Sequence, residues 1–360
     1  MIDALKEAQK GEPGTRSAPQ DSSRAAAPAQ ASLSLGYMAS VLGGILGALA
    51  AFYGLLFMLH ASGNLPPPAF SNSLCVDEKL SFLREQPPAS PNLLVIGSSV
   101  AWRHFDGATV SQRAQGIRPL NGAFCGLHAN QSVYVANWLL DRQPSVRQVL
   151  LIAAPQDFAD CHKKPDAVFS RNDADDFVYG GASRWPYYLQ YFSPVSLIGN
   201  ARRVKDKRAN RIPLDPLVFT AFGDGPLNTA ASINGLGYGR PEPLDAACFQ
   251  AVQSLATRLQ KEGRQFIVVS SPLHPDWKAR EDADGKFIAD FNARLLDVVR
   301  TANTNTNTHN DNRYWNADGE WTTARASFTD AIHLRWSAVQ DFSAVLATHL
   351  QPATASEVPK

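Results

Sequence analysis

The chain has 360 residues and a formal net charge of +1, with 44% hydrophobic and 19% charged residues. This composition is typical of a globular protein with a sizeable core, and the near-neutral charge gives no reason to expect a nucleic-acid partner. The sequence contains no Cys-x-x-Cys pair, Walker loop or Gly-x-Gly-x-x-Gly fingerprint. Its His, Cys and Asp residues show no metal-ligand spacing, so we expect no metal and no cofactor.

The N-terminal region predicts a membrane anchor. Residues 1–34 are rich in Ala, Pro, Ser and Gln and lack an apolar period, which predicts a disordered tail. Residues 35–59 contain no Asp, Glu, Lys or Arg. Because a bilayer core needs about 20 apolar helical residues, this run predicts a transmembrane helix over 35–60 rather than a buried helix or a cleaved signal peptide. Lys and Arg precede the span and are next found at Lys79, which predicts a cytoplasmic N-terminus and an external main domain.

The rest of the chain predicts one α/β domain. Residues 61–70 contain consecutive prolines and predict a linker. Over 71–350, apolar strand patterns alternate with amphipathic helix patterns, which predicts a central parallel sheet covered on both faces, a three-layer α/β/α arrangement. The expected strands lie within 92–99, 117–124, 146–155 and 264–272, and the expected helices within 132–142, 244–263, 287–302 and 334–350.

Three regions depart from this alternation. Residues 162–247 are rich in aromatic residues, Pro and Gly and predict an insertion of local helix and loop that partly covers the top of the sheet. Residues 301–316 are polar and of low complexity, and predict a flexible loop. Residues 351–360 are expected to form a C-terminal tail.

The four cysteines leave several pairings open. In an oxidising compartment they could form two disulfides with three connectivities, or they could remain free buried thiols. A pair between Cys125 and Cys161 is slightly favoured, because each of them follows a predicted strand end. The other two cysteines are Cys75 and Cys248.

Polar residues gather where the predicted strands end. Ligands of an open parallel sheet bind beyond the carboxyl ends of its strands, so these residues are expected to lie close together. The strand ends read Gly97-Ser98-Ser99, Asn121-Gly122, Pro155-Gln156-Asp157 and Ser270-Ser271-Pro272.

Asp330 and His333 lie just before the last predicted helix. Their spacing lets both side chains face one cleft, and a histidine held by a carboxylate can activate a serine. Taken singly, Asp330 and the pair Ser98-Ser99 are explained as helix caps, and His333 as a partly buried polar residue. Taken together, they predict a Ser-His-Asp site.

This ordered set resembles the SGNH, or GDSL-like, hydrolase and acyltransferase superfamily over about residues 90–350. The resemblance implies an SGNH/flavodoxin-like fold. It implies Ser99 as the nucleophile, with Ser98 where the family has Asp, and Asp330 and His333 as the other triad members. The Asp-x-x-His block is matched in full.

The resemblance also implies an oxyanion hole. Its donors are the backbone amide of Ser99, the amide of Gly122 or alternatively Gly126, and a third group. The family supplies the third donor from an Asn, where this chain has Gln156.

The resemblance further implies a class of function. Membrane-anchored members with a Gly-Ser-Ser block look like bacterial proteins that O-acetylate exported polysaccharides or cell-wall glycans, beside a multi-spanning acyltransferase that supplies the acyl group. The expectation is therefore a periplasm-facing O-acyltransferase on the bacterial inner membrane. An esterase or deacetylase with the same triad is an alternative, and a non-catalytic scaffold of an export complex is another.

The sequence around Ser99 also bears on a different hydrolase fold and on possible substrate contacts. The stretch 97–101 is close to the nucleophile elbow of α/β-hydrolases, but that fold places its serine after several strands. Trp102 and His274 are possible substrate contacts, and His104 is expected on a solvated helix face.

Overall fold

The computed structural model describes residues 34–71, 73–212, 215–228, 237–239, 242–304 and 312–350. The tail expected over 1–34, apart from Ser34, and the tail expected over 351–360 lie outside the described residues. The chain divides into two compact units, residues 1–55 and 56–360.

The first described element is the apolar helix α1, Leu35–Ala61. It contains 27 residues, has a mean hydropathy of 2.1 in its most apolar stretch and is long enough to cross a membrane. At about 1.5 Å per residue, such a helix exceeds the hydrocarbon thickness of about 30 Å. The sequence-based prediction of one N-terminal helix able to span a membrane is confirmed.

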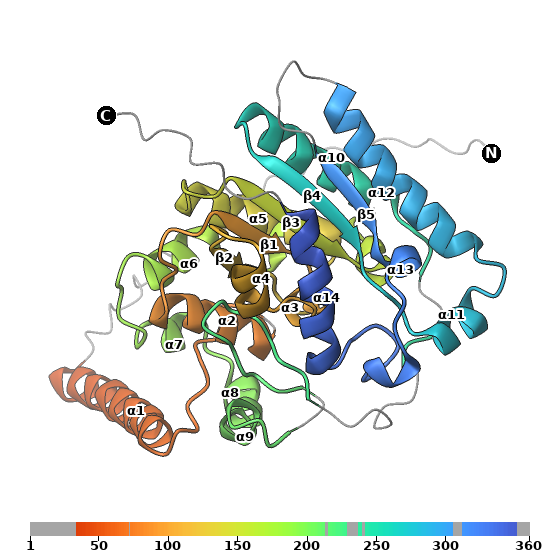
Figure 1. Cartoon of the computed structure of the whole chain (residues 1–360). Coiled ribbons are helices and arrows are strands. Elements are labelled where there is room, and N and C mark those ends of the chain that lie inside the picture. The colour runs from red at the N-terminus through yellow and green to blue at the C-terminus, as the bar shows by residue number, and fades with distance from the viewer. Residues whose placement is uncertain are drawn as a thin grey trace, which may run out of the picture. The chain divides into compact units, whose positions relative to one another are not determined.

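The larger unit is built on a five-stranded sheet in the order β2-β1-β3-β4-β5 (Figure 1). All of its strand pairs are parallel, so the predicted α/β class with a parallel sheet is confirmed. The strands are β1 (Leu93–Ile96), β2 (Pro119–Asn121), β3 (Gln148–Ala153), β4 (Gln265–Ser270) and β5 (Arg313–Asn316).

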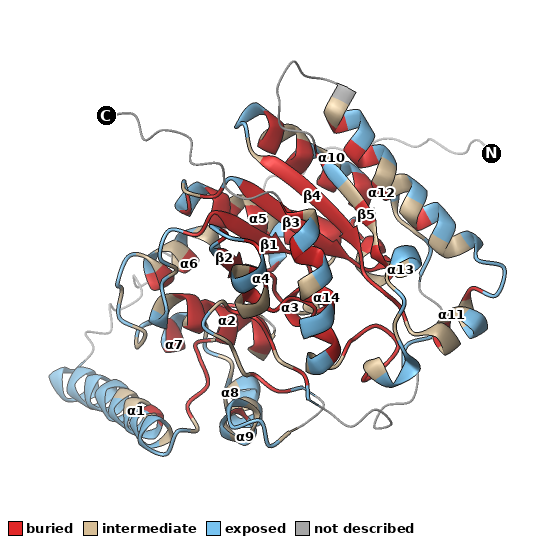
Figure 2. Cartoon of the chain, viewed as in Figure 1, coloured by how far each residue is buried: buried red, intermediate tan, exposed pale blue. Residues whose placement is uncertain are grey.

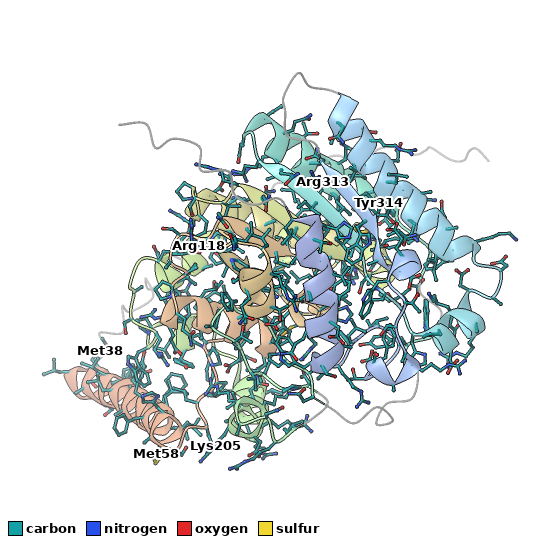
Figure 3. The ribbon with its side chains drawn as sticks, in the orientation of Figure 1. Met38, Met58, Arg118, Lys205, Arg313 and Tyr314 are labelled. Carbon is teal, nitrogen blue, oxygen red and sulfur yellow. A yellow bond between two sulfur atoms is a disulfide. The ribbon has the colours of Figure 1, made fainter. Side chains whose placement is uncertain are left out.

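Strand β5 corrects one sequence-based prediction. It lies within 301–316, which was expected to be a flexible loop, and helix α12 also extends into that region as far as Thr304. Residues 305–311 lie outside the described residues. As the last strand of the sheet, β5 pairs with β4 alone. Of its four residues, only Trp315 is buried. Figure 3 labels two of the others, Arg313 and Tyr314. A short edge strand with one buried side chain leaves little apolar signal in the sequence.

Both faces of the central strands are buried, as the red strands in Figure 2 show. Successive side chains point to opposite faces. Leu151 and Val268 join one hydrophobic cluster, to which α5, α10 and α12 contribute. Ile152 and Val269 join another, to which α3, α4 and α14 contribute. These helices are α3 (Ser99–Arg103), α4 (Gly107–Arg113), α5 (Ala129–Arg142), α10 (Ala246–Lys261), α12 (Lys286–Thr304) and α14 (Trp336–His349).

The segment between β3 and α10 contains short helices and loops. It includes the region 162–247 that was expected to be an insertion. Its helices are η1 (Pro155–Phe158), η2 (Pro165–Ala167), α6 (Arg171–Val178), α7 (Tyr187–Gln190), α8 (Pro194–Ala201) and α9 (Val204–Arg208). The remaining helices of the unit are α2 (Leu74–Glu85), α11 (Pro275–Glu281), α13 (Ala317–Glu320) and η3 (Arg325–Ser327).

The Pro-rich segment 61–70 packs against the domain instead of standing free. Residues 65–68 are buried. The Tyr188 hydroxyl donates to the Pro66 carbonyl oxygen at 2.6 Å, so the insertion helps to hold this segment.

The two disulfides join Cys75 to Cys125 and Cys161 to Cys248. The favoured pair of Cys125 with Cys161 is therefore wrong. These cysteines follow β2 and β3, and β1 lies between those two strands in the sheet. Cys125 instead pairs with Cys75 in α2, and Cys161 pairs with Cys248 in α10, so all four cysteines are oxidised.

Candidate active site

Ser99, His333 and Asp330 form a continuous row of hydrogen bonds. Ser99 Oγ lies 3.0 Å from His333 Nε2. His333 Nδ1 lies 2.8 Å from Asp330 Oδ2. Because the carboxylate accepts at Nδ1, that nitrogen carries the proton, and Nε2 keeps its lone pair for the serine hydroxyl. This is the arrangement in which a histidine can remove the serine proton.

A tight turn holds the histidine and the aspartate together. Asp330 Oδ1 accepts hydrogen bonds from the backbone N–H groups of Ile332 at 2.9 Å and His333 at 2.8 Å. Burial alone would raise the pKa of Asp330, but the hydrogen bond and charge of His333 and these two amides outweigh it, so the pKa lies below its ordinary value. Asp330 is therefore ionised and oriented before any substrate arrives.

The turn after β1 gives the two serines different surroundings. Gly97 has a φ of 139°, and a Cβ there would lie 2.7 Å from the Ile152 carbonyl oxygen, so the turn requires glycine. Ser98 is 2% exposed, and its Oγ accepts from the Val100 N–H group at 3.3 Å as the cap of α3. Ser99 instead lines a cavity together with His333.

Asp157 lies behind Ser98. Burial raises the pKa of Asp157 to about 7, although hydrogen bonds from Ser98 and from the Ala154 backbone oppose the increase. The carboxyl group thus ties η1, which follows β3, to the nucleophile turn, which follows β1. These two strands are neighbours in the sheet.

The cavity beside Ser99 has a volume of about 570 Å³. Ser99 is the first residue of α3, and its N–H group has no acceptor within the helix. Gly126, in the loop after β2, also lines the cavity and has a φ of 69°. The other described residues around it include Cys75, Arg103, Cys125, Lys207, Asp215, Leu227 and Tyr238.

Gly122 does not occupy the position expected from the resemblance. Its N–H group donates to the Val95 carbonyl oxygen at 2.8 Å, in continuation of the β1–β2 pairing. This amide is therefore already used by the sheet and is not free for an oxyanion, contrary to the prediction. A Cβ at Gly122 would lie 2.4 Å from Leu139 Cδ1, so close packing explains the glycine. Gly126, the alternative, is the glycine of this loop that reaches the cavity.

Gln156 is not among the described residues that line the cavity of Ser99. It sits on η1 and lines a second cavity, in which Ser99 has no part. Both polar atoms of its side chain are buried, and neither has a hydrogen-bond partner within the described part of the chain. The role of Gln156 as third oxyanion donor therefore stays a prediction.

Two possible substrate contacts are involved in packing instead. Trp102 is 1% exposed and lies against Gly225, where a Cβ would approach Trp102 Cε2 to 2.3 Å. His274 caps α11, because its Nδ1 accepts from the Asp276 N–H group at 3.1 Å. The ring of His274 packs on Phe328. Neither residue is among those that line the cavity of Ser99, and their contact with a substrate stays a prediction.

His104 is buried, although it was expected on a solvated face. Its exposed fraction is 0%. Its Nε2 accepts from the Leu334 N–H group at 2.8 Å, and its Nδ1 lies 2.8 Å from Ser271 Oγ. His104 therefore connects the end of α3 to the residue that follows His333, and we describe it as a positioning residue.

The sequence alone did not identify several charged and aromatic groups near Ser99. Arg103 is 4% exposed, and its Nη2 lies 3.4 Å from Asp215 Oδ1. Lys207 forms an ion pair with the same carboxylate. Arg103 could have been found, because it lies four residues after Ser99 on the same helix. Lys207, Asp215 and Tyr238 belong to the insertion, and no motif or spacing there indicates that they lie near Ser99.

No protein-family model matches the chain, and no curated protein matches it. Among the residues that the structure describes, no group of three or more His, Cys, Asp or Glu side chains could hold a metal ion. The chemistry of the site is therefore inferred from its own residues, which form a serine hydroxyl, a base and an orienting carboxylate beside an open cavity.

Proposed function

We propose that the chain is a membrane-anchored serine O-acyltransferase that transfers an acyl group, most simply acetyl, to an exported polysaccharide or cell-wall glycan. Its domain is the three-layer α/β/α domain of the SGNH type. The single observation that carries the proposal is the hydrogen-bonded row from Ser99 Oγ through His333 to Asp330, with distances of 3.0 and 2.8 Å.

The proposed reaction has two halves. Ser99 Oγ attacks the acyl carbonyl carbon of a donor ester while His333 Nε2 takes the hydroxyl proton. The amides of Ser99 and Gly126 face the resulting oxyanion. The donor alcohol then leaves with the proton from His333, and Ser99 keeps the acyl group as an ester.

In the second half, a glycan hydroxyl attacks the acyl-enzyme. His333 removes the proton of that hydroxyl and returns it to Ser99 Oγ as the new ester is released. Throughout both halves, Asp330 accepts the Nδ1–H of His333 and stabilises the imidazolium form. If water takes the place of the glycan, the same atoms perform hydrolysis. An assay must therefore count both products.

The proposed location is the bacterial inner membrane, with the N-terminus in the cytoplasm and the domain in the periplasm. Helix α1 supports a single span. The two disulfides support an oxidising compartment for the domain. A multi-spanning membrane acyltransferase is the proposed supplier of acyl groups. A scaffold of an export complex would have no need for a hydrogen-bonded Ser-His-Asp row, which favours the enzyme.

The test uses the full chain in detergent micelles. It is incubated with an activated acetyl ester, with and without a glycan oligosaccharide, and both acetate and acetylated glycan are measured. We expect Ser99→Ala to lower turnover on the order of 10⁴-fold or more. Acetylated glycan supports transfer, and acetate release that is independent of the acceptor supports the esterase. Equal turnover by Ser99→Ala and wild type would overturn both.

A covalent probe tests the nucleophile without knowledge of the substrate. A fluorophosphonate should label the wild-type chain on the peptide that contains Ser99. Ser98→Ala should still be labelled, because Ser98 caps α3 and does not face the cavity. Labelling that survives Ser99→Ala but is lost in Ser98→Ala would assign the nucleophile to Ser98.

A further inference from the structure

Tyr238 lies between two cavities, one of which contains Ser99, beyond the carboxyl end of β1. It lines both the cavity of Ser99, of about 570 Å³, and a second cavity of about 680 Å³. Its ring lies edge-on to that of His333, with the two ring centres 6.2 Å apart. The residue is 39% exposed, and its carbonyl oxygen accepts from Trp277 Nε1 at 2.9 Å and Arg280 Nη2 at 3.0 Å.

The second cavity lies one strand away from the nucleophile. Gln156 on its wall follows the end of β3, and Ser99 follows the end of β1, the adjacent parallel strand. A molecule in the second cavity would therefore approach Ser99 across the carboxyl ends of β3 and β1, and it would pass Tyr238 on the way. Both volumes fall in the range of about 300–1,000 Å³ that small-molecule sites occupy.

The wall of the second cavity is polar and carries negative charge. Gln156 lines this wall, but both polar atoms of its side chain are buried, and the imidazole groups on the wall are those of His128 and His162. Asp160 is paired with His162 and Lys163. Asp245 accepts from the backbone of Cys161, and Glu242 is exposed. Carboxylate and imidazole groups beside an exposed aromatic ring suit a ligand with many hydroxyl groups and an apolar ring face. Glu242 and Asp245 have no lysine or arginine beside them among the described lining residues, so their carboxylates disfavour an anionic ligand.

We propose that the second cavity is the acceptor subsite and that it takes a neutral or amine-bearing sugar residue of the glycan, with the sugar ring against Tyr238. This inference rests on the proposed function and identifies its acceptor class. In this arrangement the acyl group occupies the cavity of Ser99, and the acceptor hydroxyl reaches the acyl-enzyme from the Tyr238 side. The bound sugar then competes with water for the acyl group by proximity.

The test compares transfer with hydrolysis in the full chain in detergent micelles. The acceptors are three tetrasaccharides of equal length, made of N-acetylglucosamine, glucosamine or galacturonate, and the donor is an activated acetyl ester. For the first two acceptors we expect Tyr238→Ala to lower the ratio of transfer to hydrolysis at least about tenfold, because the ring face is lost. Tyr238→Phe keeps the ring and should retain most of the ratio. Galacturonate should receive little acetyl in any variant.

A matched control is Phe192→Ala, which removes an exposed aromatic side chain that lines neither cavity. It should leave the ratio unchanged. Binding is measured separately by saturation-transfer NMR on Ser99→Ala, which needs no catalysis. The same sugars should bind to Ser99→Ala, and binding should weaken when Tyr238→Ala is added.

The outcomes separate the two proposals. Turnover that does not depend on Ser99 overturns the proposed function, while the NMR experiment still decides the subsite. A ratio that is equal in wild type and Tyr238→Ala, with Ser99-dependent turnover intact, overturns the subsite alone. Galacturonate acetylated as well as the neutral sugar, or no binding of any of the three sugars, overturns the proposed ligand class.

Discussion

His104 shows how one buried side chain can hold the hydrogen-bonded row of Ser99, His333 and Asp330 in place. Burial lowers the pKa of His104 well below its ordinary value, so its ring stays neutral near pH 7. The neutral ring accepts from the Leu334 N–H group at Nε2 and donates to Ser271 Oγ from Nδ1. A protonated ring would carry a hydrogen on Nε2 and could not accept from Leu334. The position of the turn beside His333 therefore depends on a histidine that does not titrate near pH 7.

We expect His104→Leu to lower kcat on the order of tenfold or more with little change in KM, because the turn that carries His333 shifts while no substrate contact is lost. Leaving the Leu334 N–H group buried and unpaired should also cost about 1–3 kcal/mol of unfolding free energy. His104→Gln restores an acceptor and should recover part of kcat. Steady-state kinetics and urea unfolding check this, and wild-type kcat in His104→Leu would refute the positioning role.

Asp157 leads to a second prediction at the scale of single residues, which concerns how the free energy of unfolding changes with pH. Its pKa is about 7 in the folded chain, above the ordinary value of 3.8, so between pH 4 and 7 the folded state holds a proton that the unfolded state has lost. This carboxyl group therefore stabilises the fold less as pH rises through that window, by up to about 1.4 kcal/mol per pH unit. Asp157→Asn should gain unfolding free energy relative to wild type at pH 8 more than at pH 5. Urea midpoints at both values test this.

The control for that experiment is Asp297→Asn, an exposed position on α12. It should shift the urea midpoint equally at both pH values. If Asp157→Asn does the same, the buried carboxyl group does not titrate in this window.

At the residue scale, the sequence predicts positions better than roles. Ser99, Asp330 and His333 lie at a strand end and in one short turn, so the strand pattern and a three-residue spacing were enough to place them in one site. The role of Gly122 depends on whether its amide is already paired with Val95, which is a property of the register and not of the residue type. The surroundings of Trp102 likewise come from Gly225, which lies far along the chain.

At the element scale, the disulfide between Cys75 and Cys125 holds the first turn of α2 to the loop after β2. Both of its cysteines line the cavity of Ser99, as does Gly126, the neighbour of Cys125. The other disulfide joins the loop after η1 to the first turn of α10. Of these two crosslinks, only the first therefore restrains a loop that lines the cavity of Ser99.

We expect Cys75→Ala combined with Cys125→Ala to lose about 2–4 kcal/mol of unfolding free energy, and also to lose kcat at temperatures where the chain stays folded. Cys161→Ala combined with Cys248→Ala should lose a similar amount of stability and retain more of its kcat. Calorimetry and turnover with an activated ester make the comparison. Equal loss of kcat in both double variants would show that the crosslink acts on the whole fold and not on the loop.

Elements with a strong apolar pattern were predictable, because burial on both sheet faces requires continuous apolar runs such as those of β1, β3 and β4. Strand β5 was not predictable, because it is an edge strand with only one buried residue and because a polar repeat precedes it in the sequence. The disulfide pairing required the order of strands in the sheet, and the apolar runs do not encode which strands are neighbours.

At the scale of the whole molecule, an apolar helix precedes a folded unit that contains the candidate site. The described part of α1 before residue 56 is almost entirely exposed, which is expected of a helix whose environment is lipid. Lys6, Lys10, Arg16 and Arg24 precede it, and no Lys or Arg follows it until Lys79. By the positive-inside rule, the site should lie on the side of the membrane away from the cytoplasm.

The absence of a free thiol allows this topology to be tested directly, because all four cysteines are in disulfides. A single cysteine introduced as Ser254→Cys, at an exposed position on α10, should react with a membrane-impermeant maleimide in spheroplasts. Ser17→Cys, in the segment before the span, should react only after lysis. The reverse pattern would place the domain in the cytoplasm and remove its access to exported glycans. Labelling of both sites without lysis would mean that α1 does not separate two compartments, and the chain would then be bound to one face of the membrane.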